Sequence, residues 1–395
     1  MKRLFKFLPP FAPDYSGVCS ALFELGGISV ILDASGCTGN YTGYDEPRWY
    51  GGPGNVYCSG LREMDAVLGD EAKLFRKVQE YLGRRRAAFI ALLGSPAPMV
   101  IGMDYAAVAA EMAQQFDLPV LAFATSGMHY YDQGASQALL AVARQFVKPP
   151  SRKAADGVNI IGATPLDLSS ANLQALRREL EKAGCSIVSC WSMGSDLAAI
   201  GRAAEAGLNL VVSGTGLAAA RYLESQYGIP FMTGIPVGKL AGSRLLNTIR
   251  SGRSGDVVQV PAPLPAGVDP GPALVIGEQV TANSIRRCLQ DDFGFQRVDV
   301  ASYFNLDAAL LAAGDRYLQS EDDLVELTRA GGYAVVIGDP LYQPLVQAAR
   351  PQYIGIPHYA VSSKIFHMDR RCYLGEEGNA MIAEGFERVL MESVN

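Results

Sequence analysis

The sequence lacks several features that would assign the chain to common protein classes. It has no run of about 18 uninterrupted apolar residues, so we expect no membrane-spanning helix and no membrane partner. It has no basic excess, since 34 Lys and Arg stand against 40 Asp and Glu, and this argues against nucleic acid as a partner. The first residues run from Met1 to Pro9 without the apolar core of a signal peptide, so we predict a cytoplasmic protein.

Two further absences concern nucleotide and disulfide chemistry. No Gly-Lys-Ser/Thr triplet closes a phosphate-binding loop, so an ATP site of that type is not expected. The segment from Gly214 to Ala219 resembles the glycine pattern of dinucleotide-binding folds, but alanine replaces the last glycine of that pattern. The 7 cysteines are scattered and odd in number, unlike the framework of a small disulfide-linked domain. Thiols in a reducing compartment favour metal or redox chemistry instead.

What the sequence does contain is a regular alternation of short apolar runs and longer amphipathic stretches. Such alternation is typical of parallel sheets with right-handed crossovers and helices on both faces. Proline-rich linkers at residues 147–157 and 261–272 interrupt the series. We therefore predict an α/β protein of three Rossmann-like, doubly wound domains at residues 1–150, 151–265 and 266–395. Strands are expected at residues 27–33, 87–93, 119–124, 158–162, 186–190, 209–213, 273–277, 297–301 and 334–338, with helices at 105–115 and 377–392.

Three cysteines lie in or beside glycine-rich segments near the N-terminus. Cys19 ends the segment SGVC, Cys37 lies in the turn SGCTG after the first expected strand, and Cys58 follows a loop containing GGPG. Iron–sulfur clusters need thiolate ligands, and glycine loops can offer backbone N–H groups to the cluster sulfurs. On spacing alone, ordinary buried thiols are the more common outcome. A cluster usually takes four ligands, so a further one would come from elsewhere in the chain or from a second chain.

Several segments in a shared order resemble the nitrogenase component-1 type oxidoreductases. This family includes the nitrogenase α and β chains, dark-operative protochlorophyllide reductase and nickel-sidechlorin cyclase-type proteins. The resemblance begins at Cys19 and the turn ending in Cys37, and continues with LREMDAVLGDE at residues 61–71. LNLVVS at 208–213 then leads to YGIP at 227–230, and His358 and His367 precede YLG at 373–375. The matching segments span nearly the whole chain.

The resemblance implies paired subunits, in a homodimer or a heterodimer with a paralogous chain. An iron–sulfur cluster would lie between the subunits and receive electrons from an ATP-dependent iron protein. Cys19 and Cys37 match two cluster-ligand positions of the family. The third family cysteine is absent from GSPAP at residues 94–98, and Cys58 is its candidate replacement. This departure favours a [4Fe-4S] cluster shared between subunits over a larger one.

A second departure concerns the position where the nitrogenase α chain uses cysteine to hold its molybdenum–iron cofactor. That position is Ser213 here, and a neutral hydroxyl is a poor ligand for a soft metal. His358 matches the cofactor-ligating histidine but would not retain the cofactor alone, so neither this cofactor nor dinitrogen reduction is expected. The resemblance instead implies a substrate cavity bounded by Ser213, His129 and His358. There His358 would donate a proton, since an ordinary imidazole titrates near neutrality. For each histidine, a hydrogen-bonded structural role is the alternative.

Three functions compete at this stage. The first is a reductase that takes electrons from the iron protein, and the second is a non-catalytic scaffold for metallocluster or cofactor assembly. The third is a metal-free binding protein that uses a cleft between parallel-sheet domains. The aromatic loop at residues 41–50, together with Asp14 and Tyr15, is a candidate docking face for the iron protein, because it neighbours the cysteines in sequence and interfaces are enriched in aromatic residues. The alternative is that these aromatic rings only pack over the loop.

Overall fold

Three parallel β-sheets build the chain in the computed structural model, which describes residues 5–51, 54–62, 71–194, 196–251, 270–347, 351–366 and 372–392. The first sheet has the strand order β2-β1-β3-β4, the second β6-β5-β7-β8 and the third β11-β10-β9-β12-β13. Every strand pair within these sheets is parallel. The predicted α/β fold with three parallel sheets is therefore confirmed.

The central strands are short and buried, because helices cover both faces of a parallel sheet. The first sheet contains β1 (Ile28–Ile31), β2 (Val56–Cys58), β3 (Ile90–Leu93) and β4 (Val120–Phe123). The second contains β5 (Ala154–Ile161), β6 (Ser186–Cys190), β7 (Ala206–Val211) and β8 (Phe231–Thr233). The third contains β9 (Ala273–Ile276), β10 (Val298–Ser302), β11 (Arg316–Tyr317), β12 (Val335–Gly338) and β13 (Gln352–Gly355).

The helices connect these strands as crossovers and cover the sheets. Those of the N-terminal sheet are α1 (Asp14–Leu22), α2 (Gly36–Asn40), α4 (Glu71–Leu82), α5 (Pro96–Ile101), α6 (Tyr105–Phe116) and α7 (Tyr131–Phe146). Those that follow are α8 (Ser170–Lys182), α9 (Leu197–Gly201), α10 (Leu217–Tyr227), α11 (Leu240–Arg250), α12 (Gln279–Phe293), α13 (Glu321–Gly331), α14 (Tyr359–Ser362) and α15 (Gly375–Glu392). None of the helices in the described part of the chain is long and apolar enough to cross a membrane.

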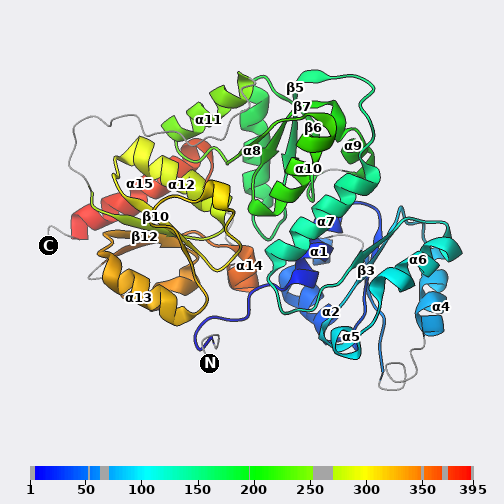
Figure 1. Cartoon of the computed structure of the whole chain (residues 1–395). Coiled ribbons are helices and arrows are strands. Elements are labelled where there is room, and N and C mark those ends of the chain that lie inside the picture. Colours follow the sequence, from blue (N-terminus) through cyan, green and yellow to red (C-terminus); the bar gives the residue numbers. More distant parts are fainter. Residues whose placement is uncertain are drawn as a thin grey trace.

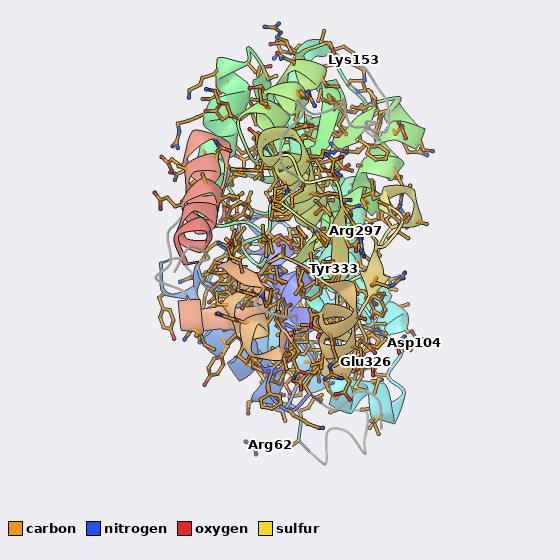
Figure 2. All side chains as sticks on the ribbon, turned by 90° about the vertical axis from the view of Figure 1, so that its left-hand side faces the viewer. Arg62, Asp104, Lys153, Arg297, Glu326 and Tyr333 are labelled. Carbon is orange, nitrogen blue, oxygen red and sulfur yellow. The ribbon has the colours of Figure 1, made fainter. Side chains whose placement is uncertain are left out.

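The three sheets form three lobes that meet near α7 and α14 (Figure 1). The view from the side places Lys153 of the middle lobe and Arg62 of the N-terminal lobe at opposite ends of the molecule (Figure 2). In the third lobe the Arg297 guanidinium lies 5.6 Å from the centre of the Tyr333 ring, and both residues are labelled in Figure 2. The lobes thus surround a central region to which each contributes loops.

Apolar packing joins the lobes to one another. One core continues from Leu176 and Leu208 of the middle lobe to Val275 and Ile337 of the third lobe. A second core joins Leu139 of α7 to helix α10. The strands of each sheet lie inside the three predicted domain ranges, but helix α15 returns toward the middle lobe, where Gly375 bridges to Val237. The exact domain limits stay a prediction.

Helices α1 and α7 cross at a contact that only glycine allows. A Cβ atom added to Gly17 would lie 1.9 Å from the carbonyl oxygen of Tyr131, and one added to Gly134 would lie 1.9 Å from that of Asp14. The crossing fixes the first turn of α7, which carries Tyr131 into the region between the lobes. The glycines therefore position a residue of the site described below.

The segment before α1 ties the N-terminal lobe to the third lobe. The backbone N–H groups of Lys6, Phe7 and Leu8 all donate to one oxygen of Glu321, at 2.7 to 2.9 Å. Phe11 packs among aromatic rings of the third lobe, including Tyr303. These contacts hold the lobes on either side of the central region in a fixed relation.

Candidate functional site

Asp167 is the central residue of a polar cluster in the middle of the molecule. It lies in the loop after β5, where the carboxyl ends of the strands open toward the other lobes. The hydroxyls of Thr164 and Ser213 donate to Asp167 Oδ2 at 2.8 and 2.9 Å. The Tyr131 hydroxyl donates to Asp167 Oδ1. Three hydroxyl donors thus satisfy a carboxylate that is almost wholly buried.

His358 completes this cluster from the third lobe. Its Nε2 lies 3.1 Å from Tyr131 Oη and 3.5 Å from Asp167 Oδ1. Its backbone N–H donates to Asp339 Oδ2 at 2.8 Å, which fixes the start of α14. Because the Tyr131 hydroxyl donates its hydrogen bond to Asp167, its oxygen can accept a hydrogen bond from an N–H at His358 Nε2. The hydrogen bonds therefore assign the proton to Nε2 and leave Nδ1 as the nitrogen available to a ligand.

The environment keeps the Tyr131 hydroxyl protonated. Burial, followed by the negative charges of Asp167 and Glu278, raises the pKa of Tyr131 well above its ordinary value. Burial, followed by the charge of Asp167, also raises the pKa of Glu278. Burial and nearby negative charge thus make Tyr131 and Glu278 hold their protons to a higher pH than they would in water.

Glu278 occupies the helix end where an anionic ligand would otherwise bind. Its Oε1 accepts from the backbone N–H groups of Gly214 and Val280 at 2.8 and 2.9 Å, and its Oε2 accepts from that of Thr281 at 3.0 Å. Such N–H groups at the start of a helix are the usual phosphate site of nucleotide-binding folds. An internal carboxylate fills it here, so the start of α12 does not serve a nucleotide phosphate.

Two cavities flank the cluster. The smaller has a volume of about 30 Å³ and is lined by His358, Asp167 and mainly apolar side chains after β9 and β12. The larger has a volume of about 420 Å³ and is bounded by residues of all three lobes, from Arg48 to Met381. Asp167, Ile356, Pro357 and Tyr373 line both cavities, so the two cavities adjoin one another.

The structure places two of the three predicted cavity residues at this cluster. His358 lines the smaller cavity, and Ser213 is fully buried with its hydroxyl committed to Asp167 and to Thr215. His129 has an exposed side chain and lines neither of these two cavities, so the structure does not bring it to the cluster. The physical reason is the start of α7: the chain turns inward after His129 and brings Tyr131 to the cluster instead. His367 lies outside the described residues.

Cys19 has surroundings that do not suit a metal ligand. It lies on α1, every residue of which is buried, and its own side chain is 0% exposed. Burial and the nearby Glu46 carboxylate raise the pKa of the Cys19 thiol, and burial raises the pKa of the Cys37 thiol as well. The prediction of Cys19 as a cluster ligand therefore disagrees with its packing, because solvent or a second chain cannot reach it without unpacking α1.

Cys37 and Cys58 are partly exposed, and both lie near the carboxyl end of β1. Cys37 is the second residue of α2, after β1, and burial followed by the charge of Asp33 raises the pKa of its thiol. Cys58 ends β2, and its thiol donates to the carbonyl oxygen of Asp33 at 3.2 Å. Carboxyl ends of parallel strands are where ligands bind in such folds.

The fit of one chain to an iron–sulfur cluster is incomplete. Among the residues that the structure describes, no group of three or more Cys, His, Asp or Glu side chains is arranged to hold a metal. Cys37 and Cys58 are two accessible thiols, whereas a cluster usually takes four. A single copy of the described chain therefore does not supply a complete ligand set.

The predicted docking face is only partly on the surface. Asp14 and Tyr15 are buried, because Asp14 accepts hydrogen bonds from the backbone of Ser126 and Gly127. Tyr44 and Tyr50 are exposed, as expected. Four further large apolar side chains are exposed after β3 and β4, which the sequence pattern did not indicate: Met99, Val100, Ile101 and Met128.

Asp167 and Tyr131 are the site residues that sequence reasoning missed. Asp167 lies in the turn GATPLD directly after a predicted strand, and turns at that end of a parallel strand are where ligand-binding residues collect. This signal was present, but it does not distinguish the turn from the other turns of the fold. The contact of Tyr131 with His358 spans 227 residues of sequence and becomes visible only in three dimensions.

Comparisons with known proteins agree with this arrangement. Residues 13–254 match the family described as nitrogenase component 1 type oxidoreductase. Among curated proteins, the nitrogenase iron-molybdenum cofactor biosynthesis protein NifE of Bradyrhizobium diazoefficiens is 28% identical over 201 residues, covering 49% of this chain and 36% of that protein. A light-independent protochlorophyllide reductase chain of Chloroflexus aggregans is 27% identical over 185 residues, covering 40% of this chain and 34% of that one.

Solved structures extend the likeness of the fold over the whole chain. The nitrogenase Cp1 structure at pH 6.5 superposes with a TM-score of 0.75 and 12% identity, covering 100% of this chain and 95% of that one. At this identity the likeness concerns the fold alone. The alignments with the two curated relatives span about a third of the length of each relative.

Proposed function

Because the chain belongs to the nitrogenase component 1 type oxidoreductase family, we propose that it is a nitrogenase-like reductase acting on a substrate other than dinitrogen. The family includes both oxidoreductases and assembly scaffolds. Its members bind iron–sulfur clusters and work as multimers with an iron-protein partner. In the proposal, electrons reach this chain from an ATP-dependent iron protein, and the substrate reacts beside Asp167 and His358.

The contact among Tyr131, Asp167 and His358 is the observation that carries this proposal. Reduction of an organic substrate consumes protons together with electrons, and the Tyr131 hydroxyl and the His358 imidazole meet here at the Asp167 carboxylate beside a cavity. With Nε2 held by Tyr131, a proton would leave His358 from Nδ1. The Tyr131 hydroxyl and the Asp167 carboxylate hold the imidazole ring in position. Asp339 orients the start of α14 through the backbone of His358.

The proposed cluster lies at Cys37 and Cys58, contributed by each of two chains. Two accessible thiols from each chain give the four thiolates that a [4Fe-4S] cluster takes. When bound, such a cluster supplies single electrons. Cys19 is not retained as a ligand because of its complete burial.

The loops around Cys37 suit a contact between two chains. Residues 34–44, 94–103 and 124–131 contain no Asp, Glu, Lys or Arg. They follow strands of the first sheet and carry the exposed Met99, Val100, Ile101 and Met128. Interface cores are depleted in charge and enriched in methionine and aromatic residues. The partner is a second copy or a paralogous chain.

A turnover assay tests the reductase proposal. The protein is combined anaerobically with a purified iron protein and ATP, with protochlorophyllide as the first trial substrate. We expect ATP-dependent oxidation of the iron protein over many turnovers, and His358→Gln should abolish it while leaving the iron content unchanged. Iron-protein oxidation that stops after one equivalent, with or without substrate, would contradict a reductase.

Cofactor assembly is the second candidate, favoured by the match to a cofactor biosynthesis protein. A scaffold would hold a cluster only until an acceptor takes it. Protein loaded with radioactive iron and mixed with an apo-acceptor would then lose its label once, with the cluster intact in the acceptor. Retention of the label during turnover would exclude this role.

A further inference from the structure

A further cavity lies where the N-terminal lobe joins the middle lobe, and it shares no lining residue with the two cavities beside Asp167. It has a volume of about 520 Å³, and exposed residues in its wall open it to the surface. Part of the wall comes from residues 146–151, at the end of α7 and in the linker after it. The other part comes from residues 197–205, in α9 and the turn before β7. The volume lies within the range of pockets that take small organic ligands.

Lys148 and Arg202 place two positive charges side by side in this wall. The backbone N–H of Lys148 donates to the carbonyl oxygen of Gly201 at 3.0 Å, and Arg202 is the next residue along the chain. One backbone hydrogen bond between the linker and the end of α9 thus holds the two basic residues next to each other. Both side chains are exposed and line the same cavity. Because like charges repel, the pair attracts an anion that can contact both of them.

The carboxylate in the wall of this cavity does not neutralise the pair. In the part of the chain that the structure describes, neither Lys148 nor Arg202 forms an ion pair. Glu205 is the one acidic residue in the lining. Its carboxylate accepts from the Ser151 hydroxyl at 2.8 Å and lies 3.6 Å from Arg152 Nε. Glu205 therefore serves the linker, and the two lining cations keep their charge for a ligand.

Further basic residues extend the positive surface beyond the cavity. Arg152 and Lys153 follow in the same linker, and Lys153 is labelled in Figure 2. Lys153 Nζ donates to the backbone oxygens of Ala204 and Tyr227 at 3.0 and 3.4 Å, which leaves its positive charge without an anion. Four basic residues thus gather around one carboxylate, in a chain whose formal net charge is −6. Such a local excess of one sign raises the concentration of ligands of the opposite sign.

An apolar wall lies beside these cations. Phe146 and Leu197 are half-buried, and both pack against the core that joins α7 to α10. Both also line the cavity. Pockets for small organic molecules typically combine apolar walls with a few charged groups that fix the orientation of the ligand. The cavity is therefore complementary to a molecule with a negative charge at one end and an apolar body.

We propose that this cavity binds a small organic dianion, with the charged group at Lys148 and Arg202 and the apolar body against Phe146 and Leu197. Two adjacent cations favour a ligand with two negative charges over one with a single charge, because each negative charge is attracted by both cations. The bound anion also offsets the repulsion between the cations. The site shares no residue with the Asp167 cluster or the cysteines, so it does not rest on the proposed reductase activity.

Three naphthalene compounds with the same ring test the charge class. At about pH 7.5 naphthyl phosphate carries close to two negative charges, whereas naphthalenesulfonate carries one and naphthol none. Equilibrium dialysis should show saturable binding of naphthyl phosphate, with one molecule per chain and a dissociation constant at least about fivefold lower than that of naphthalenesulfonate. Naphthol should bind most weakly. Equal affinities for the phosphate and the sulfonate would overturn the dianion class, and no saturable binding of any of the three would overturn the site.

Substitutions of the two cations locate the binding. Lys148→Gln and Arg202→Gln should each raise the dissociation constant of naphthyl phosphate at least about fivefold, whereas Lys148→Arg keeps the charge and should retain the affinity. Arg329→Gln removes a positive charge from an exposed position of α13 in the third lobe and is the control for net charge. Unchanged affinity in Lys148→Gln, or an equal loss in Arg329→Gln, would overturn the assignment. Binding is measured without iron protein or ATP, so its failure is distinguishable from failure of the reductase proposal.

Discussion

Tyr131 is the single residue that joins the two sides of the central cluster. Its oxygen lies within hydrogen-bond distance of both Asp167 and His358, which come from different lobes. The substitution Tyr131→Phe removes that oxygen and leaves the ring, whose edge packs on Phe304. The His358 ring then loses the group that assigns its proton to Nε2.

We expect Tyr131→Phe to lower turnover at least about tenfold, in line with the usual contribution of a positioned proton-transfer group. A matched control is Tyr303→Phe, a buried tyrosine of the third lobe whose hydroxyl donates to a backbone oxygen. Unchanged turnover in Tyr131→Phe would remove the tyrosine from the proton path.

Asp132 provides a test of the electrostatics at the same helix end. It is buried, its Oδ2 accepts from the Asn305 backbone at 2.9 Å, and its Oδ1 has no hydrogen-bond partner among the described residues. Burial raises the pKa of Asp132 from 3.8 to about 7. Between those pH values the folded protein holds a proton that the unfolded chain has released. Folding is therefore favoured at low pH, and this contribution is lost as pH rises toward 7.

Replacement of this carboxyl should remove that pH dependence. The lost stability amounts to about 1.4 kcal/mol for each unit by which the pKa is raised. The free energy of unfolding of Asp132→Asn should therefore rise relative to that of the wild type as pH increases from 5 to 8, as measured by urea unfolding. Asp156→Asn, at an exposed position of β5, controls for the change of net charge. If the free energies of unfolding of Asp132→Asn and the wild type differ by the same amount at every pH, the raised pKa of Asp132 is contradicted.

At the scale of elements, the crossing of α1 and α7 determines where Tyr131 lies. Both close contacts at this crossing are between glycine and a backbone carbonyl, so no side-chain movement can make room for a methyl group. Gly134→Ala should destabilise the protein by about 1–3 kcal/mol through overpacking. Gly39→Ala is the control, because a Cβ there meets nothing within 4 Å. Denaturant unfolding of the two variants measures the difference, and equal stabilities would contradict the close crossing.

The elements also show what the sequence could and could not predict. The apolar runs at 90–93, 273–276 and 335–338 are buried central strands, and their pattern predicted them correctly. Strands β2, β8, β11 and β13 were missed because they are short edge strands of mixed composition, such as QYIG in β13. Edge strands gain stability from a neighbouring strand rather than from an apolar pattern of their own.

The site was predicted less completely than the fold for a similar reason. His358 and Ser213 were identified through a family resemblance, which fixes a position in a motif. Asp167 and Tyr131 matter because of contacts across 36 and 227 residues. Cys19 carries the residue type of a ligand, but the packing of α1 decides that it faces the core. Residue type and spacing do not contain that information.

At the scale of the whole molecule, the uncharged surface around Cys37 predicts a dimer. Val100 is 79% exposed and lies on α5, which follows β3 of the first sheet. A charge placed there would be buried in the interface, so Val100→Asp should raise the dimer dissociation constant about tenfold or more. Leu311→Asp, at an exposed position of the third lobe, is the control. Sedimentation velocity measures the dissociation constants of both variants. An intact dimer in Val100→Asp would place the interface elsewhere.

The iron and sulfide content of protein purified without oxygen tests the central claim most directly. The account predicts about four iron and four sulfide per pair of chains, as expected for one [4Fe-4S] cluster. Cys37→Ala and Cys58→Ala should each lose this iron, whereas Cys19→Ala should retain it because Cys19 faces the core. Colourless protein without iron even after reconstitution, or iron lost on Cys19→Ala and retained on Cys37→Ala, would contradict the account.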